Sequence, residues 1–166
     1  SRNFGGDNWN DARRRAQSYA DHDPAVLVVG GVQAGLSIAA RLNQVGVDTL
    51  VVEKWPHIGD SWRKRYKSRC LHDPVWYDHL PYLPFPNDWP VFAPKDKIGD
   101  WLEMYTRVME LNYWSSTTAT SAKYDEVKKE WEVHVIRDGK DVVLRPKQLV
   151  LATGMSAKAN WPRKYS

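Results

Sequence analysis

The residues best suited to chemistry in this 166-residue chain are a glycine-rich run and one carboxylate that comes after it, Glu53. The run consists of Gly30, Gly31, Val32, Gln33, Ala34 and Gly35. A glycine-rich turn that opens a helix presents unpaired backbone N–H groups and the positive end of the helix dipole, which suit a diphosphate. A carboxylate about twenty residues later is placed to bind a ribose 2′-hydroxyl. The spacing therefore predicts a dinucleotide-binding site.

The run departs from the usual motif at its middle position, where Val32 replaces a glycine. Glycine there lets the backbone approach the diphosphate. A β-branched side chain should crowd that approach and does not easily adopt unusual backbone angles. Gly31 stands at the permissive second position, so we do not expect it to compensate. Gly30 is expected to make the tight turn, and Gly35 to let helix and strand pack closely.

Glu53 is the second half of the predicted nucleotide site. An acid at the end of the second strand fits the free ribose of FAD or NAD better than a ribose that carries a 2′-phosphate. The alternative is an ordinary carboxylate at the end of a strand. The ribose interpretation is favoured because the glycine-rich run precedes Glu53 in the right context.

A strand–helix–strand unit is predicted to position these residues. Residues 25–30 are apolar on both faces, as expected for a central strand of a parallel sheet. Residues 35–45 support a helix that Gly46 ends. Residues 47–53 are again apolar and predict a second buried strand. Short turns around one helix indicate parallel pairing.

The segment at residues 55–94 breaks this regular pattern, because prolines and aromatic residues alternate through it. A long irregular stretch in a compact domain is usually functional. A helix is predicted to resume at residues 96–111, with an apolar stripe that packs in the core. That stripe consists of Ile98, Trp101, Leu102, Tyr105, Val108 and Met109.

The last part of the chain predicts a small antiparallel meander and a closing strand. Strands are expected at residues 113–124, 130–136, 141–145 and 148–152. An Asp-Gly turn at residues 137–140 is typical of a β-hairpin. At the other end of the chain, residues 8–20 predict a surface helix.

Composition and charge are typical of a soluble globular protein, with 42% hydrophobic and 27% charged residues. The net charge of +4 is mild, and the basic runs at residues 13–15 and 63–69 are interpreted as solvated surface, with phosphate contact second. No nucleic-acid partner is expected. No stretch is apolar and long enough to span a bilayer, and the start is unlike a signal peptide, so we expect a cytoplasmic protein. The single cysteine, Cys70, excludes an internal disulfide and a C-x-x-C redox pair.

Several short motifs, taken in their order along the chain, resemble the flavin-containing monooxygenases, including the plant YUCCA type and the Baeyer–Villiger relatives. They are His-Ile-Gly-Asp-Ser-Trp at residues 57–62, Leu-His-Asp-Pro at 71–74, Leu-Pro-Tyr-Leu-Pro-Phe-Pro at 80–86, Trp-Pro-Val-Phe at 89–92, and Leu-Ala-Thr-Gly at 151–154. The order of these pieces is more specific than any one of them. The resemblance runs from about Ala25 to the C-terminus.

The resemblance implies an α/β fold, a Rossmann-like FAD-binding domain with a parallel sheet, helices and a small antiparallel β-meander. It is incomplete relative to the full fold with two dinucleotide domains. Residues 1–23 would be a polar, helical extension and residues 24–166 the FAD-binding domain, with the NADPH domain absent. The family reaction uses NADPH and FAD to place one oxygen atom of O₂ on a small organic substrate.

The resemblance also implies where FAD binds. The adenine half would lie on Gly30–Gly35 and Glu53, and the flavin half nearer Ser61, Trp62 and His72. Trp62 offers an apolar face and an N–H to a site that must exclude water. The alternatives are a packed aromatic for Trp62 and a structural turn histidine for His72. The candidate cofactor-binding residues are Gly30, Gly31, Val32, Gln33, Ala34, Gly35, Glu53, Lys54, Ser61, Trp62, His72, Thr153 and Gly154.

The chain departs from the family pattern after Gly154. It has no second glycine fingerprint for NADPH and no Phe-x-Gly-x-x-x-His segment there. The hydride donor and most of the substrate pocket are therefore expected to lie elsewhere, and no catalytic side chain or metal ligand is identified. We expect a chain that carries FAD-site residues but is inactive alone.

Three alternatives stay open on the sequence. The first is a non-catalytic remnant or interaction domain that keeps the fold without the cofactor, as Val32 suggests. The second is a relative of the disulfide reductases, which the absence of C-x-x-C disfavours. The third is a simple NAD-dependent dehydrogenase, which the aromatic insertion and the meander disfavour. Aromatic residues at 76–89 are expected to be exposed and to allow self-association.

Overall fold

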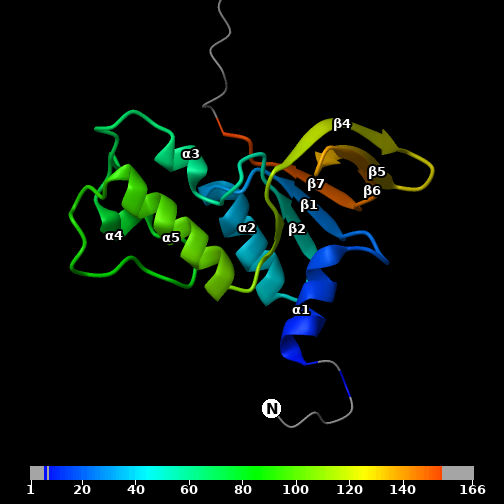
Figure 1. Ribbon diagram of the computed structural model, residues 1–166, viewed down its shortest axis with the longest axis horizontal. Coiled ribbons are helices and arrows are strands. Elements are labelled where there is room, and N and C mark those ends of the chain that lie inside the picture. Colours follow the sequence, from blue (N-terminus) through cyan, green and yellow to red (C-terminus); the bar gives the residue numbers. More distant parts are fainter. Residues whose placement is uncertain (1–5, 7, 155–166) are drawn as a thin grey trace, which may run out of the picture.

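The computed structural model describes residue 6 and residues 8–154 of the chain (Figure 1). The helices are α1 (Trp9–Ser18), α2 (Gln33–Gln44), α3 (Asp60–Arg63), α4 (Val75–Asp78) and α5 (Lys95–Val108). The strands are β1 (Val26–Val29), β2 (Thr49–Val52), β3 (Asn112–Trp114), β4 (Thr117–Asp125), β5 (Glu130–Arg137), β6 (Lys140–Leu144) and β7 (Gln148–Leu151). These elements form two sheets, and the predicted α/β fold class is confirmed.

The main sheet has four parallel strands in the order β3-β2-β1-β7. β1 lies between β2 and β7, with Val26 opposite both Thr49 and Gln148. The predicted unit of strand, helix and strand is confirmed as β1, α2 and β2. The carboxyl ends of β1, β2 and β7 therefore meet at one edge of the sheet, where nucleotide sites of such sheets lie.

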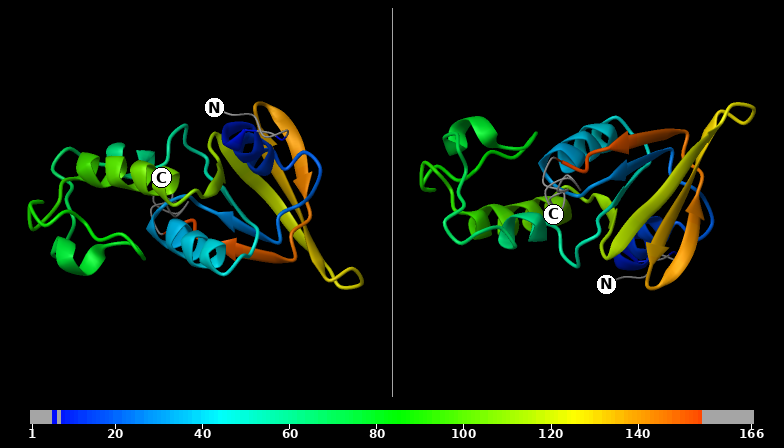
Figure 2. Two further views of the ribbon diagram at one scale, coloured as in Figure 1. Left: turned by 90° about the horizontal axis from the view of Figure 1, so that it is seen from below. Right: turned by 90° about the horizontal axis from the view of Figure 1, so that it is seen from above.

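Successive residues of the central strands face two different hydrophobic cores, because side chains alternate along a strand. In β1, Val26 and Val28 pack with α2 and α5, whereas Leu27 packs with the antiparallel sheet. In β2, Val51 faces the first core, and Leu50 faces the second. Figure 2 shows the result, with α2 on one side of the parallel sheet and the antiparallel sheet with α1 on the other.

The antiparallel sheet is the predicted meander, in the order β4-β5-β6. Asp138 and Gly139 form the predicted hairpin turn with φ angles of 51° and 73°. The single strand expected at residues 113–124 is wrong. The chain forms β3 in the parallel sheet, turns at Ser116 with a φ of 49°, and continues as β4 in the antiparallel sheet.

The predicted N-terminal helix is confirmed as α1, but its basic run is not simply solvated. Arg13 donates to the carbonyl oxygens of Glu110 (2.6 Å) and Leu111 (2.9 Å), and it pairs with the Glu110 carboxylate at 2.8 Å. It also donates to the side chain of Asn112. Arg13 thus joins α1 to the start of β3.

Tyr19, at the end of α1, completes this attachment. Its hydroxyl donates to Asp48 at 2.7 Å and accepts from Asn112 at 2.9 Å. Burial, followed by the hydrogen bond to Asp48, raises the pKa of Tyr19. A neutral, hydrogen-bonded Tyr19 against Trp114 therefore seals one end of the second core.

The irregular segment between β2 and α5 contains two short helices, α3 and α4, that the proline pattern concealed. We expected the aromatic residues of this segment to be exposed, but only some of them are. Trp76 and Tyr77 are 61% and 80% exposed, but Phe85 is buried and stacks on Trp89. In α5 the predicted stripe packs in the core except for Val108, which is 57% exposed.

Among the described residues, no helix has both the length and the apolar character needed to cross a membrane.

The layered packing makes Leu27 a sensitive position, because it is fully buried between the two sheets. We expect Leu27→Ala to lower the free energy of unfolding by about 2–5 kcal/mol. The matched control is Leu151→Ala in the neighbouring strand, where the side chain is 72% exposed and the loss should stay within about 0.5 kcal/mol. Urea unfolding followed by circular dichroism measures both. Equal losses would show that Leu27 is not a core residue.

Candidate functional site

The glycine-rich loop lies between β1 and α2, and its first and last glycines are sterically required. Gly30 has a φ of +114°, and a Cβ there would lie 2.3 Å from the carbonyl oxygen of Ala152. A Cβ on Gly35 would lie 1.9 Å from the carbonyl oxygen of Gly30. The expected roles of both residues, the tight turn and the close packing of helix on strand, are confirmed.

Glu53 lies beside this loop and is tied to it. Its Oε2 accepts a hydrogen bond of 2.7 Å from the backbone N–H of Gly31, and its Oε1 accepts one of 3.0 Å from the N–H of Trp55. The side chain is buried, with 5% of the residue exposed. Each carboxylate oxygen keeps a lone pair after these bonds. Glu53 therefore fixes the loop and retains acceptor capacity toward a ligand.

Gly31 is less permissive than its motif position suggests. A Cβ there would lie 2.7 Å from Cδ1 of Ile58 and 3.0 Å from Cβ of Glu53. Ile58 is fully enclosed in the core, so its side chain has little room to move. The expectation that the second glycine is a free position is therefore wrong.

Val32 is the N-cap residue of α2 and is half-buried against the first core. Its φ of −116° and ψ of −164° are extended values that valine adopts readily. The expected conflict between a β-branched residue and the backbone angles of the loop is therefore wrong. The loop has accommodated valine in an ordinary conformation, with its side chain directed at protein.

Gln33, the first residue of α2, connects the loop to α3. Its Oε1 accepts a hydrogen bond of 3.1 Å from Nε1 of Trp62. Trp62 is 7% exposed, and Ser61 beside it has an enclosed hydroxyl without a hydrogen-bond partner. The structure thus brings Trp62 of the predicted flavin half next to the loop.

His72 is exposed and is linked to Trp62 through a third residue. Arg69, which the sequence interpretation had placed in a solvated run, stands between them. Its Cζ is 5.6 Å from the centroid of the Trp62 ring, and its Nη1 lies 2.5 Å from Nε2 of His72. Because guanidinium only donates, Nε2 of His72 is the acceptor. Trp62, Arg69 and His72 therefore form one connected group.

The remaining predicted residues lie around the loop. Thr153 follows β7 and its backbone nitrogen would be 3.2 Å from a Cβ on Gly30, so it borders the loop directly. Gly154 is exposed with a φ of +70°, and Ala34 is exposed on the first turn of α2. Lys54 is exposed, with its ammonium 5.2 Å from the Trp55 ring.

Arg63 holds α3 against α5 and was missed as a structural residue in the basic run. It pairs with Asp60 at 3.1 Å, Asp100 at 2.9 Å and Glu103 at 2.7 Å. Burial alone would lower the pKa of Arg63, but hydrogen bonds to Asp100, Asp60 and Glu103 raise it overall. This ion-pair network keeps Trp62 in place beside the loop.

Close backbone contact supports the same junction. Gly59 has a φ of +92°, and a Cβ there would lie 2.2 Å from the carbonyl oxygen of Gly99. The signal for this contact was available in the sequence as Gly59, which precedes Asp60 and Trp62 in the family-like motif. Its partner on α5 could not be identified without the fold.

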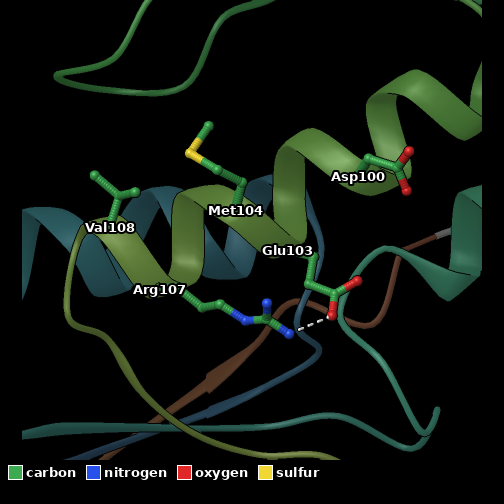
Figure 3. A pocket seen from close by; sticks show the side chains of 5 residues that line it. All are labelled: Asp100, Glu103, Met104, Arg107 and Val108. Atoms are coloured by element: carbon green, nitrogen blue, oxygen red, sulfur yellow. Dashed lines mark hydrogen bonds and ion pairs between the residues drawn. The ribbon is translucent and has the colours of Figure 1, made fainter.

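A shallow pocket of about 380 Å³ lies on the outer face of α5 (Figure 3). Its lining residues are Asp100, Glu103, Met104, Arg107 and Val108. All come from one helix, and the Glu103 carboxylate already accepts from Arg107 at 2.7 Å and from Arg63. We assign no ligand to this pocket. Among the residues that the structure describes, no cluster of His, Cys, Asp or Glu is suited to a metal ion.

The site as a whole has the features of a dinucleotide site. The loop and Glu53 supply the features of a diphosphate and ribose site at the carboxyl edge of a parallel sheet. Beyond Gln33 lie two enclosed polar atoms without partners, the Ser61 hydroxyl and Nε of Arg69. Buried polar groups are nearly always hydrogen-bonded, so these atoms point to a missing polar partner on that side.

Sequence comparison gives relatives with a stated activity, although no protein-family model matches the chain. The chain is 34% identical over 133 residues to a probable indole-3-pyruvate monooxygenase, YUCCA9, of Arabidopsis thaliana. It is 32% identical over 152 residues to the indole-3-pyruvate monooxygenase YUCCA1 of Oryza sativa subsp. japonica. These matches cover 80% and 91% of the chain but only 32% and 36% of the relatives. The chain thus spans about a third of their length.

Comparison with solved structures shows the same fold. A complex of the enzyme OTEMO with FAD and NADP matches 84% of this chain and 27% of its own, with a TM-score of 0.70 and 24% sequence identity. The predicted Rossmann-like architecture with its meander is therefore confirmed, and the resemblance drawn from the short motifs is confirmed by the sequence relatives.

The steric environment of Gly31 generates a stability prediction. We expect Gly31→Ala to lower the free energy of unfolding by about 1–3 kcal/mol, because the methyl group must displace Ile58 or Glu53 from packed positions. Gly6→Ala is the matched control, since a Cβ there meets nothing within 4 Å. Thermal unfolding of the two variants and the parent chain measures the effect. A Gly31→Ala chain as stable as the parent would contradict the packing described.

Proposed function

Because this chain is a homologue of the flavin-containing monooxygenases over most of its length, we propose that it binds FAD and forms the FAD-binding part of an NADPH-dependent monooxygenase. The observation that carries the proposal is the bond of 2.7 Å between the Gly31 N–H and the Glu53 carboxylate. It holds Glu53, the proposed ribose ligand, against the proposed diphosphate-binding loop at the carboxyl edge of the sheet.

In this proposal, residues of the glycine-rich loop and Glu53 hold the adenosine diphosphate half of FAD. The first turn of α2, from Gln33 onward, directs free N–H groups and the positive end of the helix dipole at the diphosphate. The Glu53 carboxylate accepts from the ribose hydroxyls while it keeps its bonds to Gly31 and Trp55. Lys54, Thr153 and Gly154 border this half.

Trp62, Ser61 and His72 would border the flavin half. The Trp62 ring is buried and held by Gln33, so it presents a fixed apolar surface rather than a mobile one. Such a surface excludes water from a reactive ring system. The enclosed Ser61 hydroxyl has no hydrogen-bond partner in the described chain. Bound FAD would supply the redox chemistry, and these side chains would position and shield it.

The reaction of the whole protein is also a proposal. NADPH would supply the hydride that reduces FAD, one oxygen atom of O₂ would go to a small organic substrate, and the other would leave as water. NADPH and the substrate would be bound largely by polypeptide outside these 166 residues. The support for this division is that the chain matches only 32–36% of the length of its monooxygenase relatives. On this proposal the 166 residues alone bind FAD without turnover.

A second candidate function is an interaction domain that keeps this fold and binds no cofactor. Two observations favour it. Val32 replaces the glycine that approaches the diphosphate, and the Ile58 side chain packs directly over Gly31. Both put apolar side chains in or beside the loop, so the two candidates differ in whether the loop accepts FAD.

Substitution of Glu53 tests the FAD proposal. The parent chain should retain FAD at micromolar concentration, seen as flavin absorbance in the protein peak. We expect Glu53→Gln to weaken FAD binding by about ten- to a hundredfold, because a charge-assisted hydrogen bond contributes about 1.5–3 kcal/mol. Glu126→Gln, on the exposed tip of the β4–β5 hairpin, is the charge-matched control. A parent chain without bound flavin would defeat the proposal.

Reversion of Val32 separates the two candidates. If Val32 only narrows a working site, Val32→Gly should strengthen FAD binding several-fold, measured by quenching of flavin fluorescence. If the chain has lost the cofactor because of Val32 alone, the reversion should create binding that the parent lacks. Val45→Gly, a similar change at a 73% exposed position, controls for added backbone freedom. No FAD binding in either chain would favour the interaction domain.

A further inference from the structure

Arg69 makes an unusual set of contacts for a residue in a basic run. Its guanidinium lies over two aromatic rings, with Cζ 5.6 Å from the centroid of Trp62 and 6.0 Å from that of Tyr66. Its Nη1 donates to His72 at 2.5 Å and to the Tyr66 hydroxyl at 3.3 Å. The side chain is therefore held in place by packing rather than extended into solvent.

The same guanidinium lacks a counter-charge. Among residue 6 and residues 8–154, no carboxylate lies within 4 Å of it, in contrast to Arg63, which contacts three. Nε of Arg69 is enclosed and has no hydrogen-bond partner. A planar guanidinium matches the oxygens of anionic groups, and an enclosed N–H without a partner costs about 1–3 kcal/mol. Arg69 is thus a fixed positive charge with unused donor capacity.

Arg69 contacts Trp62 and His72, two residues that the proposed function assigns to the flavin half of the site. Along the glycine-rich loop, Gly31 contacts Glu53, the proposed ribose ligand, whereas Gln33 contacts Trp62. Trp62 in turn carries Arg69 on its ring. Arg69 is therefore linked to the glycine-rich loop through Trp62 and Gln33, and it makes no hydrogen bond with Glu53.

We propose that Arg69 is a cofactor-contacting residue whose guanidinium, which pairs with no carboxylate of the described residues, faces the flavin half of FAD and favours the reduced, more electron-rich ring over the oxidised ring. This inference rests on the proposed FAD binding and adds a role that the glycine motif and Glu53 do not supply. A positive charge near a flavin ring tunes its electronics.

Charge removal at position 69 is the test. Arg69→Gln keeps a hydrogen-bonding side chain but removes the charge, and Lys67→Gln removes a neighbouring, exposed charge as the matched control. For each chain, FAD and ADP affinities are measured by titration, and the midpoint potential of bound FAD is measured against a reference dye. Circular dichroism confirms that each variant is folded.

We expect Arg69→Gln to bind oxidised FAD more weakly than the parent and to bind ADP equally well. Its affinity for reduced FAD should fall roughly tenfold more than its affinity for oxidised FAD. That tenfold ratio corresponds to a midpoint potential about 30 mV lower for a two-electron couple. Lys67→Gln should match the parent. If Arg69→Gln does not fold, Arg69→Lys becomes the test variant. It keeps the charge, so its bound FAD should have a midpoint potential close to that of the parent.

The outcomes are distinguishable. A parent chain that binds no FAD overturns the proposed function, and the role of Arg69 falls with it. A parent that binds FAD, with an Arg69→Gln variant of unchanged affinity and potential, overturns only the inference about Arg69. Equal losses of FAD and ADP affinity also overturn it, because they would place Arg69 at the diphosphate. The inference about Arg69 is also overturned if Arg69→Lys, which keeps the charge, lowers the midpoint potential of bound FAD by the roughly 30 mV expected for loss of the charge.

Discussion

One hydrogen bond, from the backbone N–H of Gly31 to the buried carboxylate of Glu53, fixes the glycine-rich loop against the parallel sheet. It joins the loop after β1 to the end of β2, two segments that the parallel sheet places side by side. Removing a partner from a buried, charge-assisted bond is costly, so both segments are held in one geometry. The tight turn at Gly30, the start of α2 and the position of Trp62 depend on that geometry.

The segment between β2 and α5 packs against the glycine-rich loop that follows β1. Residues 57–62 return toward the loop, and the contact between Gly59 and Gly99 fixes where they lie. Arg63 pairs with three carboxylates of α3 and α5, whereas Arg69 pairs with no carboxylate of residue 6 or residues 8–154. Two arginines six positions apart thus differ in their partners, since carboxylates hold Arg63 and aromatic rings and a histidine hold Arg69.

The sequence predicts the central unit well because its signals are local. Apolar runs, a helix-ending glycine and an Asp-Gly turn identify β1, α2, β2 and the β5–β6 hairpin from neighbouring residues alone. The break between β3 and β4 was missed because residues 113–124 carry strand character throughout, and only tertiary pairing assigns the two halves to different sheets. The short helices α3 and α4 were hidden by prolines that stand outside them.

Site residues could be predicted where motif spacing identifies them, but not where tertiary packing determines their role. Gly30, Gly35 and Glu53 are identified by a known arrangement of turn, helix and acid. The constraint on Gly31 comes from Ile58, and the ordinary backbone of Val32 comes from its contact with the core, neither of which a linear motif records. Arg69 differs from its basic neighbours only through Trp62, Tyr66 and His72, which the fold brings around it.

The position of β7 has a consequence for how the molecule is made. The turn at Gly30 rests on the backbone of Ala152, and β1 pairs with β7 across almost the whole length of the chain. Pairing between such distant segments closes a large loop and is slow compared with local structure. During synthesis, the glycine-rich loop therefore lacks part of its packing until the ribosome has released the segment around residue 152. Until then the edge of β1 is open to other chains, and this interval is when the molecule is most exposed to misassembly.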